Sequence, residues 1–164
     1  MRCMKSAFLA IPLTLLLAAP AMAGEVIFGA KSGPMMIDQS GIDDPTNTGL
    51  MVGYQQGVVL GDLAVEGEFT TTTSDGKVSA SGAKVSLDTK AAYVALRTAG
   101  PFYFKVKGGY LQADTKIGSS SKSDSGTSYG AGLGFGVGVL QLELEVAQTS
   151  LENKLTYVNL GIQF

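Results

Sequence analysis

Charged residues in this chain recur in pairs separated by one position, and these pairs are the first place to look for chemistry. They are Glu66 and Glu68, Lys105 and Lys107, and Glu143 and Glu145. Side chains at positions i and i+2 of a strand lie on the same face, so each pair presents two like charges together. Two carboxylates held side by side can act as an acid/base pair. That chemical use has to be weighed against a structural one.

Other features of the sequence argue against catalysis. The chain contains no His, the side chain most often used as a general base. The serines between positions 119 and 125 have no orienting partner. No cluster of Cys and His suggests a metal site, and Asp38, Asp43 and Asp44 are interpreted as solvated loop residues. We therefore expect no catalytic residue, no metal and no cofactor, and we interpret the paired charges as structural.

Alternation of apolar and polar residues surrounds the charged pairs and predicts β-strands. Leu142 and Leu144 alternate with Glu143 and Glu145, as in a strand whose two faces differ. The C-terminal segment alternates most strictly and ends on Phe164. Turn-forming residues separate eight such segments. The predicted strands are 25–31, 48–56, 62–72, 86–98, 102–114, 127–138, 139–149 and 154–164.

The connections between these segments alternate between short and long. The short ones are 56–61, 99–101 and the junction near Gly138; the long polar ones are 32–47, 73–85 and 116–126, with a brief one at 150–153 on the same side. Short periplasmic turns and longer outer loops are typical of outer-membrane barrels. A tilted strand of about 9–11 residues can cross a bilayer. The sequence therefore predicts an all-β fold, an eight-stranded antiparallel up-and-down transmembrane β-barrel.

The two faces of the strands can be assigned in two ways. In a soluble lipocalin-like barrel the apolar faces would look inward, whereas a membrane barrel turns them outward. Aromatic residues near both ends of the apolar faces resemble the girdles of a membrane barrel. The charges on the polar faces also nearly balance, as a closed lumen requires, because an isolated buried charge is costly. The predicted lumen charges are Glu66, Glu68, Arg97, Lys105, Lys107, Glu143 and Glu145.

Glycine occupies every second position of the segment 130–138. A nucleotide-binding loop would need a strand, a tight turn and a helix, which this spacing does not fit. With strand periodicity five glycines face the lumen: Gly130, Gly132, Gly134, Gly136 and Gly138. The strands on either side of this one are about 10 Å apart. We expect Lys105 and Lys107 to reach Glu143 and Glu145 above this glycine floor; the alternative is that the glycines only ease strand bending.

The N-terminal segment predicts export. Arg2 and Lys5 precede an apolar stretch, and Ala21-Met22-Ala23 is a small-x-small cleavage site. A transmembrane anchor is the alternative, but it needs about 20 apolar residues. We expect residues 1–23 to be a cleaved signal peptide and 24–164 to form one barrel domain. That domain would carry 14 acidic residues against fewer basic ones, so nucleic acid is not an expected partner.

Five segments together resemble the small outer-membrane β-barrel family, variously called OmpA-type transmembrane domain, opacity-type porin-family or OmpX-like protein. They are Glu66–Thr70, Phe102–Tyr110, Ser128–Phe135, Leu142–Glu145 and the Phe164 terminus. The resemblance implies a barrel in the cell outer membrane of a Gram-negative bacterium, surrounded by outer-membrane lipids and lipopolysaccharide. It also implies insertion by the outer-membrane assembly machinery, which recognises the last strand. The residues of that insertion signal would be Tyr157, Val158, Leu160, Ile162 and Phe164.

Three functions are compatible with this sequence. The first is a barrel with a structural or adhesion-like role, whose lumen is filled by paired charges and whose loops contact an extracellular ligand. The second is a narrow porin-like channel for small solutes, although eight strands leave little room. The third is a soluble periplasmic carrier, which membrane fractionation would separate from the first two.

Overall fold

The computed structural model describes residues 24–151 and 154–164, so the predicted signal peptide lies outside the described residues. Eight long strands and one short strand form a single sheet. They are β1 (Glu25–Ile37), β2 (Thr46–Val58), β3 (Gly61–Ser74), β4 (Gly76–Lys77), β5 (Lys84–Thr98), β6 (Phe102–Ile117), β7 (Ser120–Val137), β8 (Leu140–Thr149) and β9 (Leu155–Gln163). Within these described ranges, no helix is long and apolar enough to cross a membrane.

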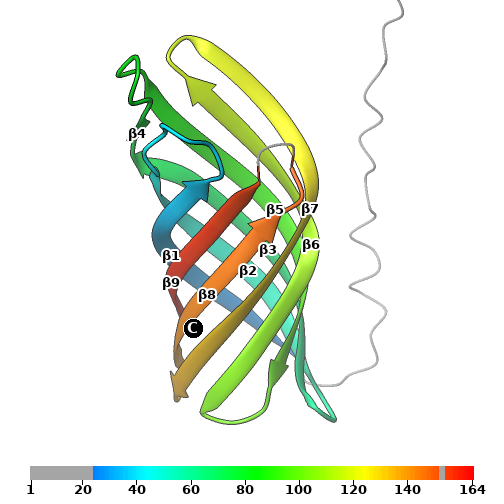
Figure 1. Ribbon diagram of the computed structural model, residues 1–164. Coiled ribbons are helices and arrows are strands. Elements are labelled where there is room, and N and C mark those ends of the chain that lie inside the picture. The colour runs from blue at the N-terminus through cyan, green and yellow to red at the C-terminus, as the bar shows by residue number, and fades with distance from the viewer. Residues whose placement is uncertain (1–23, 152–153) are drawn as a thin grey trace, which may run out of the picture.

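The sheet closes on itself. The long strands follow the order β3-β2-β1-β9-β8-β7-β6-β5, and β3 pairs with β5 to complete the circle. The N-terminal strand β1 and the C-terminal residue meet where Phe28 and Phe164 exchange two backbone hydrogen bonds of 2.9 Å each. All pairings between the long strands are antiparallel. The predicted eight-stranded up-and-down barrel is therefore confirmed (Figure 1).

The outer end of the barrel differs from the prediction. The segments 32–47, 73–85 and 116–126 are not simply loops: β1 runs to Ile37, and β6 and β7 are joined by a turn at Gly118 and Ser119. Gly33 and Pro34 interrupt the alternation in β1, and polar side chains on both faces concealed the start of β7. Backbone hydrogen bonds join a ladder whether or not one face is apolar. The β6–β7 hairpin, yellow in Figure 1, extends past the other strands at the upper end of the barrel.

The exterior of the barrel carries a continuous apolar belt. Leu144 on β8 is 53% exposed and Leu133 on β7 is 64% exposed, whereas Glu143, one residue from Leu144, is 4% exposed. Beyond the belt most outward residues are polar, with Met36 on β1 an exception. The polar ones include Ser32, Thr48, Lys90, Gln112, Thr127 and Gln148. An apolar outside and a charged inside reverse the polarity of a soluble carrier. They suit a bilayer, where a closed barrel satisfies its own backbone hydrogen bonds.

Candidate functional site

The charged lumen is the most distinctive chemical feature of the structure. All seven charged residues predicted for the lumen lie inside the barrel, and none is more than 5% exposed. They are contributed by β3, β5, β6 and β8: Glu66, Glu68, Arg97, Lys105, Lys107, Glu143 and Glu145. The fold thus gathers charges that are up to 79 positions apart in the sequence, from Glu66 to Glu145, into one cluster.

Sequence reasoning missed an eighth member of this cluster, Lys31 on β1. Its Nζ pairs with Glu68 and, at 3.4 Å, with Glu145. Lys31 lies on the same strand face as Ile27, which is 3% exposed. A signal for it existed, because the seven predicted charges contain four carboxylates and only three cations. Lys31 supplies the fourth cation, so the charges of this eight-residue cluster sum to zero.

Lys105 spans β7 to reach β8. Its Nζ lies 2.9 Å from Glu66 Oε2, 3.1 Å from Glu143 Oε1 and 3.8 Å from Glu145 Oε2. In the register of the sheet the residue directly between Lys105 and Glu145 is Gly132. The lysine side chain therefore passes over a position with no side chain, in the arrangement that the glycine spacing predicts.

Lys107, two residues along β6 from Lys105, makes a similar set of contacts nearer the outer end of the barrel. Its Nζ lies 2.5 Å from Glu68 Oε1 and 2.8 Å from Glu145 Oε1. The same ammonium group lies 4.0 Å from the centroid of the Tyr93 ring, a cation–π contact. Its register partner on β7 is Gly130. Both buried lysines are thus fully engaged, which offsets the high cost of removing their charges from water.

The glycines of β7 are not equivalent. A Cβ added at Gly134 would overlap the ring of Tyr103, whereas at Gly130 and Gly132 the nearest atoms would be backbone oxygens at 2.9 and 3.1 Å. The prediction that Gly138 belongs to the lumen floor was wrong. Strand β7 ends at Val137, and Gly138 occupies the following turn with φ of 62°, a left-handed conformation that favours glycine.

Arg97 closes the end of the lumen that lies near the short turns. Its guanidinium donates to Gln141 and, at 2.7 Å, to Gln163 Oε1. It also lies 3.7 Å from Glu143 Oε2 and 4.5 Å from the centroid of the Tyr103 ring. Two uncharged amide oxygens thus accept hydrogen bonds from this cation.

A layer of hydroxyl and amide groups lies beyond the charges toward the outer end. The Tyr157 hydroxyl is 2.7 Å from Thr70 Oγ1 and accepts a 3.1 Å hydrogen bond from Asn47 Nδ2. Thr70 Oγ1 is in turn 2.8 Å from Thr89 Oγ1. Beyond this layer the lumen is filled by an outer apolar cluster: Met35, Leu87, Leu111, Ala113, Ala147, Leu151 and Leu155. Sequence reasoning expected a polar lumen throughout and did not find this cluster.

Strand β9 presents the predicted insertion-signal residues on both of its faces. Tyr157 faces the lumen and is 5% exposed, whereas Leu160 and Phe164 face outward and are 64% and 60% exposed. Val158 and Ile162 share that outward face. The alternation predicted for this strand holds to its last residue.

Several solved structures of other proteins resemble nearly the whole of this barrel. The N-terminal β-barrel domain of OprF from Pseudomonas aeruginosa matches with a TM-score of 0.60 and 12% identity, over 87% of this chain and 100% of that one. The chain has the fold of the small outer-membrane β-barrels. Ail, the attachment invasion locus protein of Yersinia pestis, matches with a TM-score of 0.59 and 17% identity, over 86% of this chain and 97% of that one.

Neisserial surface protein A adds a third small outer-membrane β-barrel, with a TM-score of 0.59 and 9% identity over 86% of this chain and 97% of that one. No protein-family model matches the chain, and no characterised protein matches it by sequence. At these identities the likeness concerns the fold. A function must therefore be argued from the lumen and the outer surface.

Proposed function

We propose that this protein is a barrel of the Gram-negative outer membrane with a closed lumen and a surface-interaction role. The observation that carries the proposal is the contrast between its two functional parts. The lumen is filled by mutually paired charges, while the β6–β7 hairpin extends past the apolar belt at the outer end. The belt would contact outer-membrane lipids and lipopolysaccharide.

The lumen supports a closed barrel better than a pore. Around the charge cluster the two cavities inside the barrel offer about 20 Å³ and about 10 Å³ of room for the centre of a water molecule. The Arg97 contacts cross the lumen toward the short turns, where a cavity lined by Gln141 and Gln163 opens at the end of the barrel, and the outer apolar cluster lies at the other end. We expect no stable conductance in a planar bilayer. A stable conductance that shifts when Lys105 or Glu143 is neutralised would favour the narrow channel instead.

The outer surface offers a recess for a partner. A cavity with about 150 Å³ of such room lies between the hairpin and the outer apolar cluster, with Ile117, Leu151 and Leu155 among its apolar walls. A cavity of that size accommodates a group as large as benzene. An apolar side chain of a partner protein therefore fits it, and this recess supports an adhesion-like role.

A sulfated ligand is less well supported. Ail was solved in complex with the heparin analogue sucrose octasulfate, and such a polyanion needs unpaired cations. On the outer extension of this chain Lys84 Nζ lies 3.1 Å from Asp75 Oδ2, and Lys116 Nζ lies 3.9 Å from Asp88 Oδ2. Aspartates match these two lysines, and the apolar recess gives the proposal its reason to favour a protein partner over a polyanion.

Cysteine labelling on whole cells tests the location and the orientation together. Cys3 is the only cysteine of the chain, so single cysteines can be placed freely in residues 24–164. We expect Ser119→Cys, in the β6–β7 turn, to react with a membrane-impermeant maleimide. Ala99→Cys, in the turn between β5 and β6, is the matched control and should react only after lysis. Recovery of the protein in the soluble periplasm would overturn the proposal.

Two further parts of the proposal rest on chemistry and on the family resemblance. We propose no enzymatic activity, because the charged side chains are engaged in ion pairs rather than open to a substrate.

The outer-membrane assembly machinery would recognise β9 with its terminal aromatic. Phe164→Ala should then lower assembly in cells while the purified chain still folds into detergent. Equal assembly of Phe164→Ala and of the unsubstituted protein in cells would contradict this.

A further inference from the structure

Asn159 on β9 is buried in the lumen with one hydrogen-bonding group unused. Its side chain is 2% exposed, and its Nδ2 has no hydrogen-bond acceptor among the described residues. A buried donor without an acceptor is destabilising, because it loses its hydrogen bond to water on folding and gains none in return.

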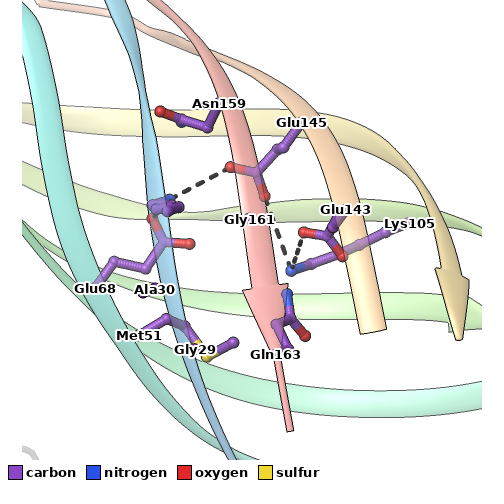
Figure 2. Close-up of a pocket in the computed structure, with 11 residues that line it drawn as sticks. Gly29, Ala30, Met51, Glu68, Lys105, Glu143, Glu145, Asn159, Gly161 and Gln163 are labelled. Atoms are coloured by element: carbon purple, nitrogen blue, oxygen red, sulfur yellow. Dashed lines mark hydrogen bonds and ion pairs between the residues drawn. The ribbon is translucent and has the colours of Figure 1, made fainter. Parts of the chain in front are cut away.

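A small cavity lies next to Asn159. Figure 2 shows the side chains that line it on the inner side of β1 and β9, with Glu68, Lys105, Glu143 and Glu145 among them. The cavity exists partly because Gly161 faces it without a side chain. It has about 20 Å³ of room for the centre of a water molecule, and one water needs about 10–15 Å³.

The walls of this cavity define what it can hold. Lys31 and Lys105 contribute two ammonium groups, and Glu68, Glu143 and Glu145 contribute three carboxylates. A metal cation would lie near the ammonium groups and an anion near the carboxylates, so the mixed walls favour a neutral group. The group must accept a hydrogen bond from Asn159 and also donate one, and it must be the size of one oxygen atom.

We propose that one ordered water molecule occupies this cavity. It accepts a hydrogen bond from Asn159 Nδ2 and donates to a carboxylate oxygen of the charge cluster. The water completes the hydrogen bonding of β9 at the point where Lys31 reaches across that strand. A second cavity, with about 10 Å³ of room, is also lined by Asn159 on the other side; it is at the lower limit for one water.

Nuclear Overhauser measurements on the whole barrel in detergent micelles test this directly. In the unsubstituted protein we expect a cross-peak between the Asn159 side-chain amide protons and a long-lived water. A crystal structure should place that water about 2.7–3.2 Å from Nδ2. A dry cavity, or an amide without a water cross-peak, would overturn the proposal.

Substitutions at Gly161 make the test independent of any one spectrum. A Cβ there would lie 3.6 Å from both Ala30 O and Lys31 Cβ, so Gly161→Ala fills the cavity without a clash. If the water is present, Gly161→Ala displaces it, leaves Asn159 Nδ2 without an acceptor and lowers the temperature midpoint of unfolding. Gly161→Ser supplies a hydroxyl in place of the water and should restore most of the stability. If the cavity is dry, filling it should raise the midpoint. Gly108→Ala, where a Cβ would meet nothing within 4 Å, gives the baseline for replacing a strand glycine.

Discussion

Lys31 Nζ on β1 lies 3.4 Å from Glu145 Oε1 on β8, across the intervening strand β9. The register places Gly161 beside Lys31 on β9, and Gly49 beside it on β2. With no side chain on either flank, the lysine can reach both Glu145 and, across β2, Glu68. The glycine arrangement that the sequence suggests for β7 thus recurs around Lys31.

The first prediction concerns this lysine. Lys31→Met should lower the free energy of unfolding by about 3–5 kcal/mol, because it leaves one buried carboxylate in excess. The measurement is urea unfolding of the purified barrel in lipid vesicles. Adding Glu68→Gln to the same chain restores neutrality and should recover part of the loss.

An exposed lysine provides the matched control. Lys84 pairs with Asp75 at 3.1 Å, but its side chain is 75% exposed, and exposed pairs are worth about 0–1 kcal/mol. Lys84→Met should therefore have little effect. Equal losses for Lys31→Met and Lys84→Met would show that the lumen charges do not act as a buried cluster.

The case of Lys31 shows how far sequence reasoning reached into this site. The alternation of apolar and polar residues allowed seven charges to be assigned to the lumen faces. This pattern is strict wherever one face of a strand meets lipid and the other faces the lumen. Lys31 lies at the edge of a segment whose alternation breaks down at Gly33 and Pro34. Charge balance was the remaining signal, since four carboxylates with three cations leave one unpaired.

The outer end of the barrel was less predictable for a physical reason. Beyond the belt both faces of β6 and β7 meet water or loop residues, so Lys122 and Ser123 carry no contrast between faces. The strands persist there because the β6–β7 ladder continues through its backbone pairing as far as Ile117 and Ser120. Alternation reports the membrane-facing part of a barrel rather than the full length of its strands.

The second prediction separates the glycines of β7. Gly134→Ala should destabilise the barrel by about 1–3 kcal/mol, because the added Cβ overlaps the Tyr103 ring. Gly108→Ala, facing outward into open space, should be neutral or slightly stabilising. The temperature at which the folded gel band is lost measures both. If Gly134→Ala matches Gly108→Ala, then the Tyr103 ring does not rest on the glycine.

The third prediction concerns the hydroxyl layer. Tyr157→Phe removes the group that bonds Asn47 and Thr70, and it should cost about 1 kcal/mol, the usual net value of one buried hydrogen bond. Tyr110→Phe is the control, because its hydroxyl bonds Ser125 at 2.8 Å on the exposed outside. A loss for Tyr110→Phe as large as that for Tyr157→Phe would contradict a special role for the buried layer.

The fourth prediction tests the apolar belt against a soluble alternative. Leu144 points outward near the middle of β8, and an Arg at the bilayer midplane of a barrel costs about 2–4 kcal/mol. Leu144→Arg should therefore destabilise the protein in lipid vesicles. Gln148→Arg, four residues further along the same outward face and beyond the belt, should cost about 0–1 kcal/mol. In a soluble barrel both arginines would be solvated, so equal and small effects would rule out a lipid-facing belt.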